Sequence, residues 1–282
     1  MNILRIGRYR VLERLGGGAS AEVYLAEDSV IPRKVALKVL HREADPSHLR
    51  RFEREVWCNS LLNHPNVVTV FDVGRHEDTH YMASEYVEGE TLRTRLDHGA
   101  LSIREAVDVA AGVARALVAA HEAWVVHRDI KPENIMIRRD GGIKVLDFSV
   151  AIQTAGGETQ DPLARPDALV GTLHYLSPEQ VRGEPIIDTR SDLYSLGVVL
   201  YETVARHRPF AGESPLDVLA MIVEGEPDPL PESVPLALRS IILRAMQKSI
   251  WSRFQTAQEM LDELDDFRLD LTLWEKVAAK PN

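Results

Sequence analysis

The sequence predicts an α+β fold, with strands gathered in the first third of the chain and helices in the remainder. Short apolar segments bounded by turn residues are typical of strands, and they occupy residues 9–15, 35–39, 67–73 and 81–86. Apolar residues then recur at helical spacing between residues 106 and 120, and further amphipathic stretches begin near residues 215, 236 and 256. A chain of 282 residues is long enough to form one large domain or two lobes around a substantial core.

The composition is that of an ordinary globular protein, with 45% hydrophobic and 27% charged residues. A net charge of −10 argues against nonspecific binding to nucleic acid or to an anionic membrane. Cys58 is the single cysteine, so no intrachain disulfide can form, which suits a reducing compartment. The apolar runs are all far shorter than a membrane span. We therefore expect a cytoplasmic protein with no membrane span in this chain and no nucleic-acid partner.

A glycine-rich turn follows the first strand. Gly16, Gly17 and Gly18 are followed by Ala19, and the chain then returns to an apolar segment that includes Val23. Small residues allow a backbone to approach a phosphate chain closely and to aim its N–H groups at it. The turn alone is a weak signal, because glycine turns occur in many hairpins, and without further support a structural turn is the better interpretation.

Lys38 interrupts the apolar strand at residues 35–39, where a lysine usually extends to solvent. A helix predicted to begin after Asp45 offers this lysine a partner. Glu55 lies on the apolar side of that helix, whereas Glu53, two positions earlier, lies on the other side. We therefore expect an ion pair between Lys38 and Glu55.

The most informative segment reads His-Arg-Asp-Ile-Lys-Pro-Glu-Asn at residues 127–134 and is followed by Asp147. Phosphoryl transfer needs an acid that orients the attacking hydroxyl, a cation that neutralises the moving phosphate, and oxygen ligands that hold Mg²⁺. Asp129 and Lys131 are the candidates for the acid and the cation, and Asn134 and Asp147 are the candidates for the metal ligands. Such a long match is far more specific than a polar loop of arbitrary composition.

This segment resembles the catalytic loop and metal-binding turn of the eukaryotic-like (Hanks-type) protein kinases, in their bacterial serine/threonine branch. The resemblance extends from about Tyr9 to about Phe267. It implies the bilobal protein-kinase fold, with a small β-rich N-lobe carrying one main helix over residues 1–86 and a larger, mostly α-helical C-lobe over residues 87–267. Residues 268–282 would form a tail or an extra helix.

The same resemblance implies cofactors and partners. ATP would be the phosphate donor, with Mg²⁺ as the metal and Mn²⁺ able to replace it, since both accept hard oxygen ligands. The partners would be protein substrates that offer Ser or Thr hydroxyls. Dimers formed through the small lobe are known in the family, so a homodimer is one expectation.

The resemblance also assigns roles in nucleotide binding. Lys38, held by Glu55, would reach the α- and β-phosphates. Four small residues would form the turn over the phosphates: Gly16, Gly17, Gly18 and Ala19. The backbone of a hinge at residues 85–87, which includes Glu85 and Val87, would bond the adenine. Three apolar side chains would contact the adenine faces, although core packing explains each of them equally well: Val23, Ala36 and Met136. Ser84 precedes the hinge, and its small side chain would leave a pocket behind the adenine open.

Residues 150–175 form a long segment rich in Gly, Asp, Thr and Pro, a length that is unusual in a compact domain unless it is functional. It resembles an activation segment. Within it, Thr172 would hydrogen-bond near Asp129 and Lys131 and help to place a substrate hydroxyl.

Two structural contacts are further implications of the resemblance. Arg253 would form a buried ion pair with Glu179, with an ordinary surface salt bridge as the alternative. Asp192 would bond the backbone of the catalytic loop.

Glycine is replaced at two positions of the family pattern. Ala21 stands at the third glycine of the turn, and Ser149 stands where glycine usually follows Asp147 and Phe148. Because serine reaches some glycine conformations only at a cost, we predict reduced switching of the segment rather than lost activity. These replacements are the only features that favour a pseudokinase, a nucleotide-binding scaffold without turnover.

Arg128 stands where the family commonly binds a phosphate on the activation segment, yet residues 160–171 contain no Ser, Thr or Tyr. Thr154 and Thr159 are the nearest acceptors, and Asp161 or Asp167 could offer a carboxylate instead. We therefore expect little dependence on segment phosphorylation. The leading hypothesis is an active kinase for proteins, since small-molecule kinases lack the Gly-Thr and Ser-Pro-Glu elements that dock a polypeptide.

Overall fold

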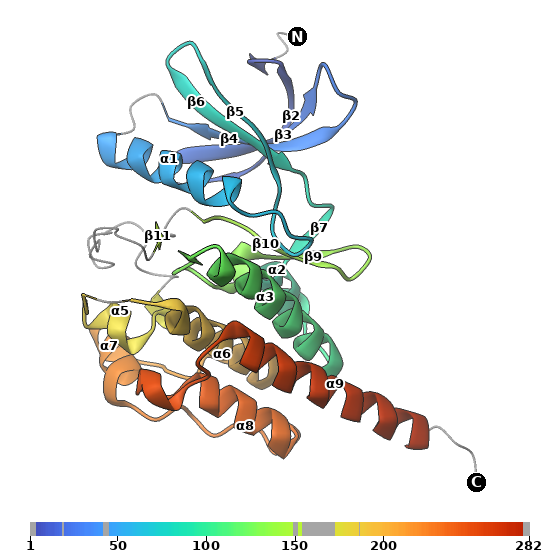
Figure 1. The fold of residues 1–282 in the computed structure, drawn as a ribbon, viewed down its shortest axis with the longest axis vertical. Coiled ribbons are helices and arrows are strands. Elements are labelled where there is room, and N and C mark those ends of the chain that lie inside the picture. The colour runs from blue at the N-terminus through green and yellow to red at the C-terminus, as the bar shows by residue number, and fades with distance from the viewer. Residues whose placement is uncertain are drawn as a thin grey trace.

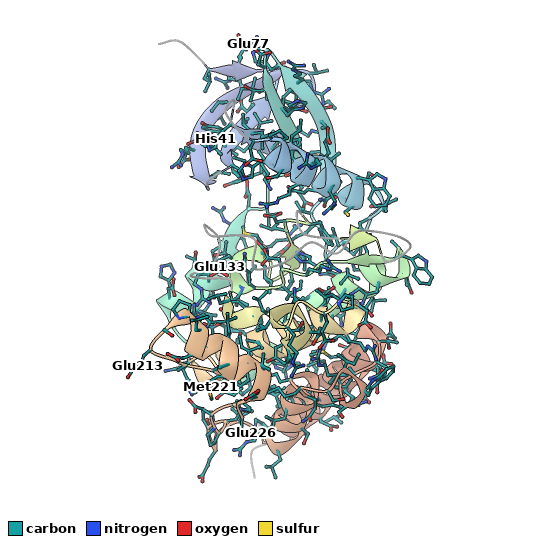
Figure 2. All side chains as sticks on the ribbon, turned by 90° about the vertical axis from the view of Figure 1, so that its left-hand side faces the viewer. His41, Glu77, Glu133, Glu213, Met221 and Glu226 are labelled. Carbon is teal, nitrogen blue, oxygen red and sulfur yellow. The ribbon has the colours of Figure 1, made fainter. Side chains whose placement is uncertain are left out.

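The computed structural model describes residues 4–18, 20–41, 45–148, 152–153, 173–185 and 187–278, with the side chains of residues 152–153 and 274–278 excepted. Within these ranges a six-stranded sheet occupies one end of the molecule and a helical part the other (Figure 1). Figure 2 shows the same division from the side, with His41 in the sheet part and Glu133 at the upper rim of the helical part. The predicted α+β class is confirmed.

Neighbouring strands of the large sheet pair antiparallel in the order β1-β2-β3-β4-β6-β5. These strands are β1 (Arg5–Ile6), β2 (Tyr9–Gly17), β3 (Ala21–Asp28), β4 (Lys34–Leu40), β5 (Val70–His76) and β6 (Thr79–Glu85). Alternate residues of β4, Val35 and Leu37, are fully buried, as the alternation of apolar residues predicts. The glycine-rich turn expected after the first strand does join β2 to β3.

One strand lies later in the sequence than predicted. The strand expected at residues 67–73 is β5 (Val70–His76), because Val67 and Val68 are used elsewhere. Val67 forms an isolated parallel bridge with Val145, and the Val68 N–H donates to the Val145 carbonyl at 3.0 Å. Both valines are buried, so their apolar character marks contact with the helical part rather than membership of the sheet.

The helix beside the sheet, α1 (Pro46–Ser60), begins where the sequence predicts. The Asp45 carboxylate accepts hydrogen bonds from the Ser47 and His48 N–H groups, and proline occupies the first helical turn. Phe52 and Glu55 lie on the buried side of the helix, and Glu53 is exposed. The cap thus fixes the start of the helix, and the carboxylate of Glu55 is directed towards the sheet.

The helical part contains α2 (Leu92–His98), α3 (Ile103–Glu122), α5 (Pro178–Val181), α6 (Thr189–Ala205), α7 (Pro215–Glu224), α8 (Leu236–Ala245) and α9 (Ala257–Ala278). Among the described residues, short 3₁₀ helices accompany them: η1 (Pro132–Asn134), η2 (Leu173–Tyr175) and η3 (Ile250–Ser252). A small sheet orders β10 (Ile143–Val145), β9 (Ile135–Arg138) and β7 (Gly89–Thr91), and β8 (Val125–Val126) pairs with β11 (Ile152–Gln153).

The largest core cluster fills this helical part, and α3 and α6 run through it with most of their residues buried. Gly112 of α3 faces Ile143 of β10 so closely that an added Cβ would lie 2.6 Å from the Ile143 Cβ. A glycine there lets the helix approach the small sheet that carries the candidate site. The side chain of Asp192 near the start of α6 is fully buried as well.

The C-terminal stretch continues α9 rather than forming an element of its own. This helix begins at Ala257 and runs without a break to Ala278, across the boundary expected at residue 268. Arg104 of α3 donates to the Thr272 hydroxyl, and Arg115 pairs with Asp265, so contacts to α3 extend along much of the helix. None of the helices in the described part of the chain has the length and apolar composition needed to cross a membrane.

Candidate active site

Lys38 and Glu55 meet as the sequence predicts. The Lys38 Nζ lies 2.8 and 2.7 Å from the two carboxylate oxygens of Glu55, which β4 and α1 bring together. The same ammonium lies 3.7 Å from Oδ1 of Asp147, which follows β10. Burial by itself would lower the pKa of Lys38, but the carboxylates of Asp147 and Glu55 raise it above its ordinary value. A permanently charged ammonium therefore connects the sheet part to the helical part.

Asp192 holds the backbone of the catalytic loop. Its carboxylate accepts the N–H groups of His127 at 2.9 Å and Arg128 at 2.7 Å, and it contacts the His121 ring at 2.9 Å. Although burial works in the opposite direction, these hydrogen bonds and charges hold the pKa of Asp192 below its ordinary value. Arg128 adopts a left-handed backbone with φ of 65°, a conformation that needs such support. The expected contact with the loop backbone is confirmed.

Asp129, Lys131 and Asn134 form one hydrogen-bonded group. The Lys131 Nζ donates to Oδ2 of Asp129 at 2.8 Å. The Asn134 amide nitrogen donates to the Asp129 carbonyl at 2.9 Å and to Oδ2 at 3.1 Å. The Asp129 N–H donates in turn to Nδ1 of His127 at 3.2 Å. Two of these contacts, from Lys131 and from Asn134, end on the same carboxylate oxygen, Oδ2, and so they fix the orientation of the Asp129 carboxylate.

Asp147 is held against this group by its neighbours in the chain. The Leu146 N–H donates to the Asn134 carbonyl at 2.8 Å, and the Leu146 carbonyl lies 3.0 Å from Nε2 of His127. Phe148 is fully buried, with its ring centre 4.5 Å from that of His127. Asp147 itself has φ of 56°, the left-handed region, which turns its carboxylate out of the strand direction. The four residues predicted for phosphoryl transfer thus share one region.

The donor set suits a hard divalent cation. Both hydrogen bonds of Asn134 use its amide nitrogen, so neither occupies its oxygen. Asp147 adds a partly exposed carboxylate. Within the described part of the chain no cluster of three or more His, Cys, Asp or Glu could hold a metal by itself. One carboxylate and one amide oxygen match an ion such as Mg²⁺, which keeps waters and takes its other ligands from a substrate's phosphates.

The residues expected around a nucleotide come from the sheet and from β9. The strand register places Val23 opposite Lys38, and Ala36 opposite Ser84, whose hydroxyl donates to the Ala36 carbonyl. Met136 lies on β9, paired with Thr91 of β7. The apolar candidates therefore occupy two separate sheets, one on each side of the hinge.

At the hinge the Glu85 N–H donates to the Thr69 carbonyl, so it is not available to a base. The Glu85 carboxylate pairs with the buried Lys144 at 2.6 Å, and Val87 is buried. At Gly16 and Gly18 an added Cβ would meet no atom within 4 Å among the described residues, so packing there does not demand glycine. Ala19 lies outside the described residues.

Much of the predicted activation segment lies outside the described residues, including Ser149, Thr154, Thr159, Asp161, Asp167 and Thr172. Arg128, the expected phosphate-binding residue, is buried, and its guanidinium donates to the Ile187 carbonyl at 3.1 Å. Burial lowers the pKa of Arg128 to about 10. The predicted pair between Arg253 and Glu179 is confirmed as a buried one, with two contacts of 2.7 Å.

Sequence reasoning missed a polar network beside the catalytic loop. Arg93 of α2 donates to Glu133 of η1 at 3.0 Å, to both carboxylate oxygens of Glu202 on α6, and to the Tyr175 hydroxyl. The Tyr175 hydroxyl also donates to Glu202. The four residues are far apart in the sequence and share no motif, so no pattern in the sequence could have indicated that they meet.

A two-part fold in which two ammonium groups, three carboxylates and an amide lie close together is typical of enzymes that bind phosphate groups. The family model described as "Protein kinase domain" matches residues 9–264, and the chain belongs to that family. The predicted bilobal protein-kinase fold and the resemblance to the Hanks-type bacterial kinases are therefore confirmed.

Curated relatives are similar over nearly the whole chain. "Serine/threonine-protein kinase PrkC" of Bacillus subtilis is 40% identical over 260 residues, which cover 90% of this chain and 39% of the relative. "Serine/threonine-protein kinase PknB" of Mycolicibacterium smegmatis is 41% identical over 269 residues, which cover 91% of this chain and 42% of the relative. The chain thus spans about two fifths of the length of these relatives. Protein kinases in general use ATP and a divalent metal ion.

Proposed function

We propose that this chain is an active serine/threonine protein kinase domain that transfers the γ-phosphate of ATP to Ser or Thr hydroxyls of protein substrates. The observation that carries the proposal is the convergence of Lys38 and Glu55 with Asp147, beside the group formed by Asp129, Lys131 and Asn134. Two of these residues come from the sheet part and four from the helical part. Loss of any one would remove a large part of the rate, and all are present.

The chain's own residues would act as follows. Lys38, kept charged and oriented by Glu55, binds the α- and β-phosphates of the nucleotide. Asp129 orients the substrate hydroxyl and accepts its proton, while Lys131 neutralises the charge of the phosphate in transfer. The carboxylate of Asp129 is positioned for this work, because two donors fix one of its oxygens.

The metal would be held by the Asn134 oxygen and by Asp147, where Mg²⁺, or Mn²⁺ in its place, supplies positive charge to the phosphates. Thr172 is proposed to place the substrate hydroxyl near Asp129 and Lys131. For the base, we propose backbone contacts from the Glu85 carbonyl and from Val87 at the hinge, since the Glu85 N–H is already bonded to Thr69. Three apolar side chains would contact the faces of the adenine: Val23, Ala36 and Met136. The turn over the phosphates would consist of Gly16, Gly17, Gly18 and Ala19.

The names of these relatives, serine/threonine-protein kinases, support serine and threonine as acceptors and proteins as substrates. Because ATP is made in the cytoplasm, we propose that the domain works there, which the buried thiol of Cys58 also suits. A homodimer stays a prediction, which sedimentation of the purified chain would test.

The test is transfer of labelled phosphate from ATP with Mg²⁺ to myelin basic protein and to matched peptides that differ only in a central Ser, Thr or Tyr. We expect label on the Ser and Thr peptides, with little on the Tyr peptide. Asp129→Asn should abolish transfer, whereas Asp78→Asn, at an exposed carboxylate in the β5–β6 turn, should leave it unchanged. Nucleotide binding without any transfer would instead indicate a binding module.

A further inference from the structure

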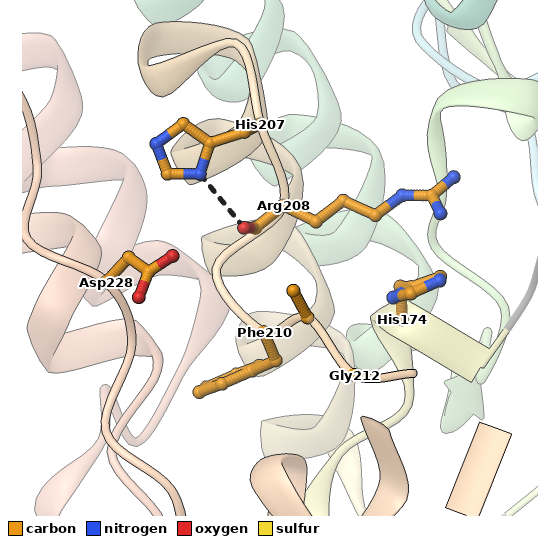
Figure 3. A pocket seen from close by; sticks show the side chains of 7 residues that line it. His174, His207, Arg208, Phe210, Gly212 and Asp228 are labelled. Carbon is orange, nitrogen blue, oxygen red and sulfur yellow. Dashed lines mark hydrogen bonds between the residues drawn. The ribbon is translucent and has the colours of Figure 1, made fainter. Parts of the chain in front are cut away.

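A polar cavity lies in the helical part, away from the candidate active site. Its volume is about 490 Å³, and it lies between η2, the loop after α6 and the segment after α7. The polar and aromatic side chains that line it are His174, His207, Arg208, Phe210 and Asp228. Figure 3 shows the Arg208 guanidinium extending to the side on which His174 lies, away from Asp228.

The guanidinium of Arg208 lies near the carboxylate of Glu202, which already accepts hydrogen bonds from other residues. Its Nε lies 3.7 Å from Oε1 of Glu202, an ion pair too long for a hydrogen bond. Both Glu202 oxygens instead accept hydrogen bonds from Arg93, and one also accepts the Tyr175 hydroxyl. Among the described residues the Arg208 guanidinium donates no hydrogen bond to any group. A guanidinium has five N–H donors, so this side chain offers a fork that suits an incoming carboxylate.

His174 contributes a polar atom at the same side of the cavity. Its Nδ1 is buried and has no hydrogen-bond partner among the described residues. Burial lowers the pKa of this ring, and the charge of Arg208 lowers it further, while a backbone hydrogen bond with Phe210 works in the opposite direction. Burial therefore favours the neutral form of the His174 ring, and Arg208 is the cationic side chain on this side of the cavity.

A short series of ion pairs and hydrogen bonds connects the cavity to the catalytic loop. Glu202 lies beside Arg208, Arg93 binds Glu202, and Arg93 also donates to Glu133 of η1. Lys131 and Asn134, on either side of Glu133, hold Asp129. His174 is two residues after Thr172, the proposed hydroxyl-placing residue. A polypeptide laid across Asp129 would therefore pass close to this cavity.

We propose that Arg208 and His174 form a subsite for an acidic side chain, Asp or Glu, of the polypeptide whose hydroxyl is phosphorylated. This proposal rests on the proposed function. A single guanidinium with a neutral imidazole matches the single charge of a carboxylate. A phosphate dianion would need more positive charge than this single guanidinium supplies. The subsite thus selects among Ser and Thr acceptors by their flanking sequence.

The test measures kcat/KM on peptides with one central Thr and neutral flanks, in which a single Glu occupies each flanking position in turn. A second series carries Gln at the same positions. For the wild type we expect one position where Glu exceeds Gln by about tenfold, the scale of a charge-assisted bidentate hydrogen bond. Arg208→Gln should bring this ratio close to one, and His174→Ala should lower it in the same direction.

Arg206→Gln is the matched control, because it removes the same charge from an exposed position two residues away. It should keep the Glu-to-Gln ratio of the wild type. Each ratio compares two peptides on one enzyme preparation, so partial unfolding of a variant cancels. The subsite is excluded if no position favours Glu, or if Arg208→Gln keeps the preference. If the wild type phosphorylates neither the peptides nor myelin basic protein, the proposed function fails and the subsite falls with it.

Discussion

Arg253→Met should destabilise the protein strongly. The Arg253 side chain is fully buried and donates to both oxygens of Glu179 at 2.7 Å. It also donates to the carbonyls of Gln247 at 2.6 Å, Lys248 at 3.1 Å and Arg190 at 3.3 Å. Methionine fills a similar length but leaves one buried carboxylate and three carbonyls without this donor.

The expected loss follows from the burial of the pair. Removing one partner of a buried, hydrogen-bonded ion pair costs about 3–5 kcal/mol, because the other charge stays buried. For a chain of this size each kcal/mol lowers Tm by roughly 2 °C, so a Tm decrease of roughly 6–10 °C is expected. Arg244→Met is the control: Arg244 pairs with Glu259 and Glu263 at the surface, where such pairs are worth about 0–1 kcal/mol.

The pH dependence of the folding stability provides a second test of the same substitution. Burial alone would raise the pKa of Glu179, but the hydrogen bonds and charge of Arg253 hold it below its ordinary value of 4.5. In the wild type this contributes stability above pH 4.5 that is lost as the pH falls through the folded-state pKa. In Arg253→Met the effect of burial dominates, so the pKa of Glu179 rises. Protonation of Glu179 at low pH then removes the buried charge and reduces the destabilisation of the variant.

Urea denaturation of both proteins between pH 7 and pH 4 would measure this effect. The free-energy gap between wild type and Arg253→Met should narrow as the pH falls. A loss at pH 7 no larger than that of Arg244→Met, or a gap that widens on acidification, would refute the reasoning.

Three further substitutions test separate parts of the structure. Lys38→Met should lower the transfer rate at saturating ATP by roughly 100-fold or more while circular dichroism shows a folded chain, and a rate near that of wild type would contradict its role. Ser102→Ala breaks the capping box of α3, and we expect the free energy of unfolding, measured with urea, to fall by about 1 kcal/mol. An unchanged urea midpoint would show that the cap does not stabilise the protein. Gly112→Ala places a Cβ 2.6 Å from that of Ile143, so we expect a loss of about 1–3 kcal/mol that Ile143→Val partly restores; equal loss in both backgrounds would argue against this contact.

Local patterns predicted the parts of the site that depend on neighbours in sequence. The helix cap at Asp45 and the helical period placed Glu55 rather than Glu53 towards the sheet, because a two-residue step crosses to the other side of a helix. The catalytic segment at residues 127–134 was recognisable as a continuous sequence, and its internal hydrogen bonds follow from that closeness. Asp192 and Arg253 were placed only through the family resemblance.

Contacts that arise only in three dimensions were not predictable. Val67 and Val68 have the apolar character of a strand, but they pair with Val145, so β5 begins later than the pattern indicates. Arg93 gathers Glu133 and Glu202 from distant segments, and nothing in the sequence distinguishes it from an exposed arginine. The cavity beside Arg208 was missed for the same reason, since its residues come from three separate segments.

The most direct test of the account is a crystal structure of the chain with Mg²⁺ and a nonhydrolysable ATP analogue. We predict that the Asn134 oxygen and the Asp147 carboxylate bind the metal, and that the Lys38 Nζ, still paired with Glu55, contacts the α- and β-phosphates. A nucleotide bound elsewhere, or Asn134 and Asp147 directed away from the metal with Lys38 remote from the phosphates, would contradict the account.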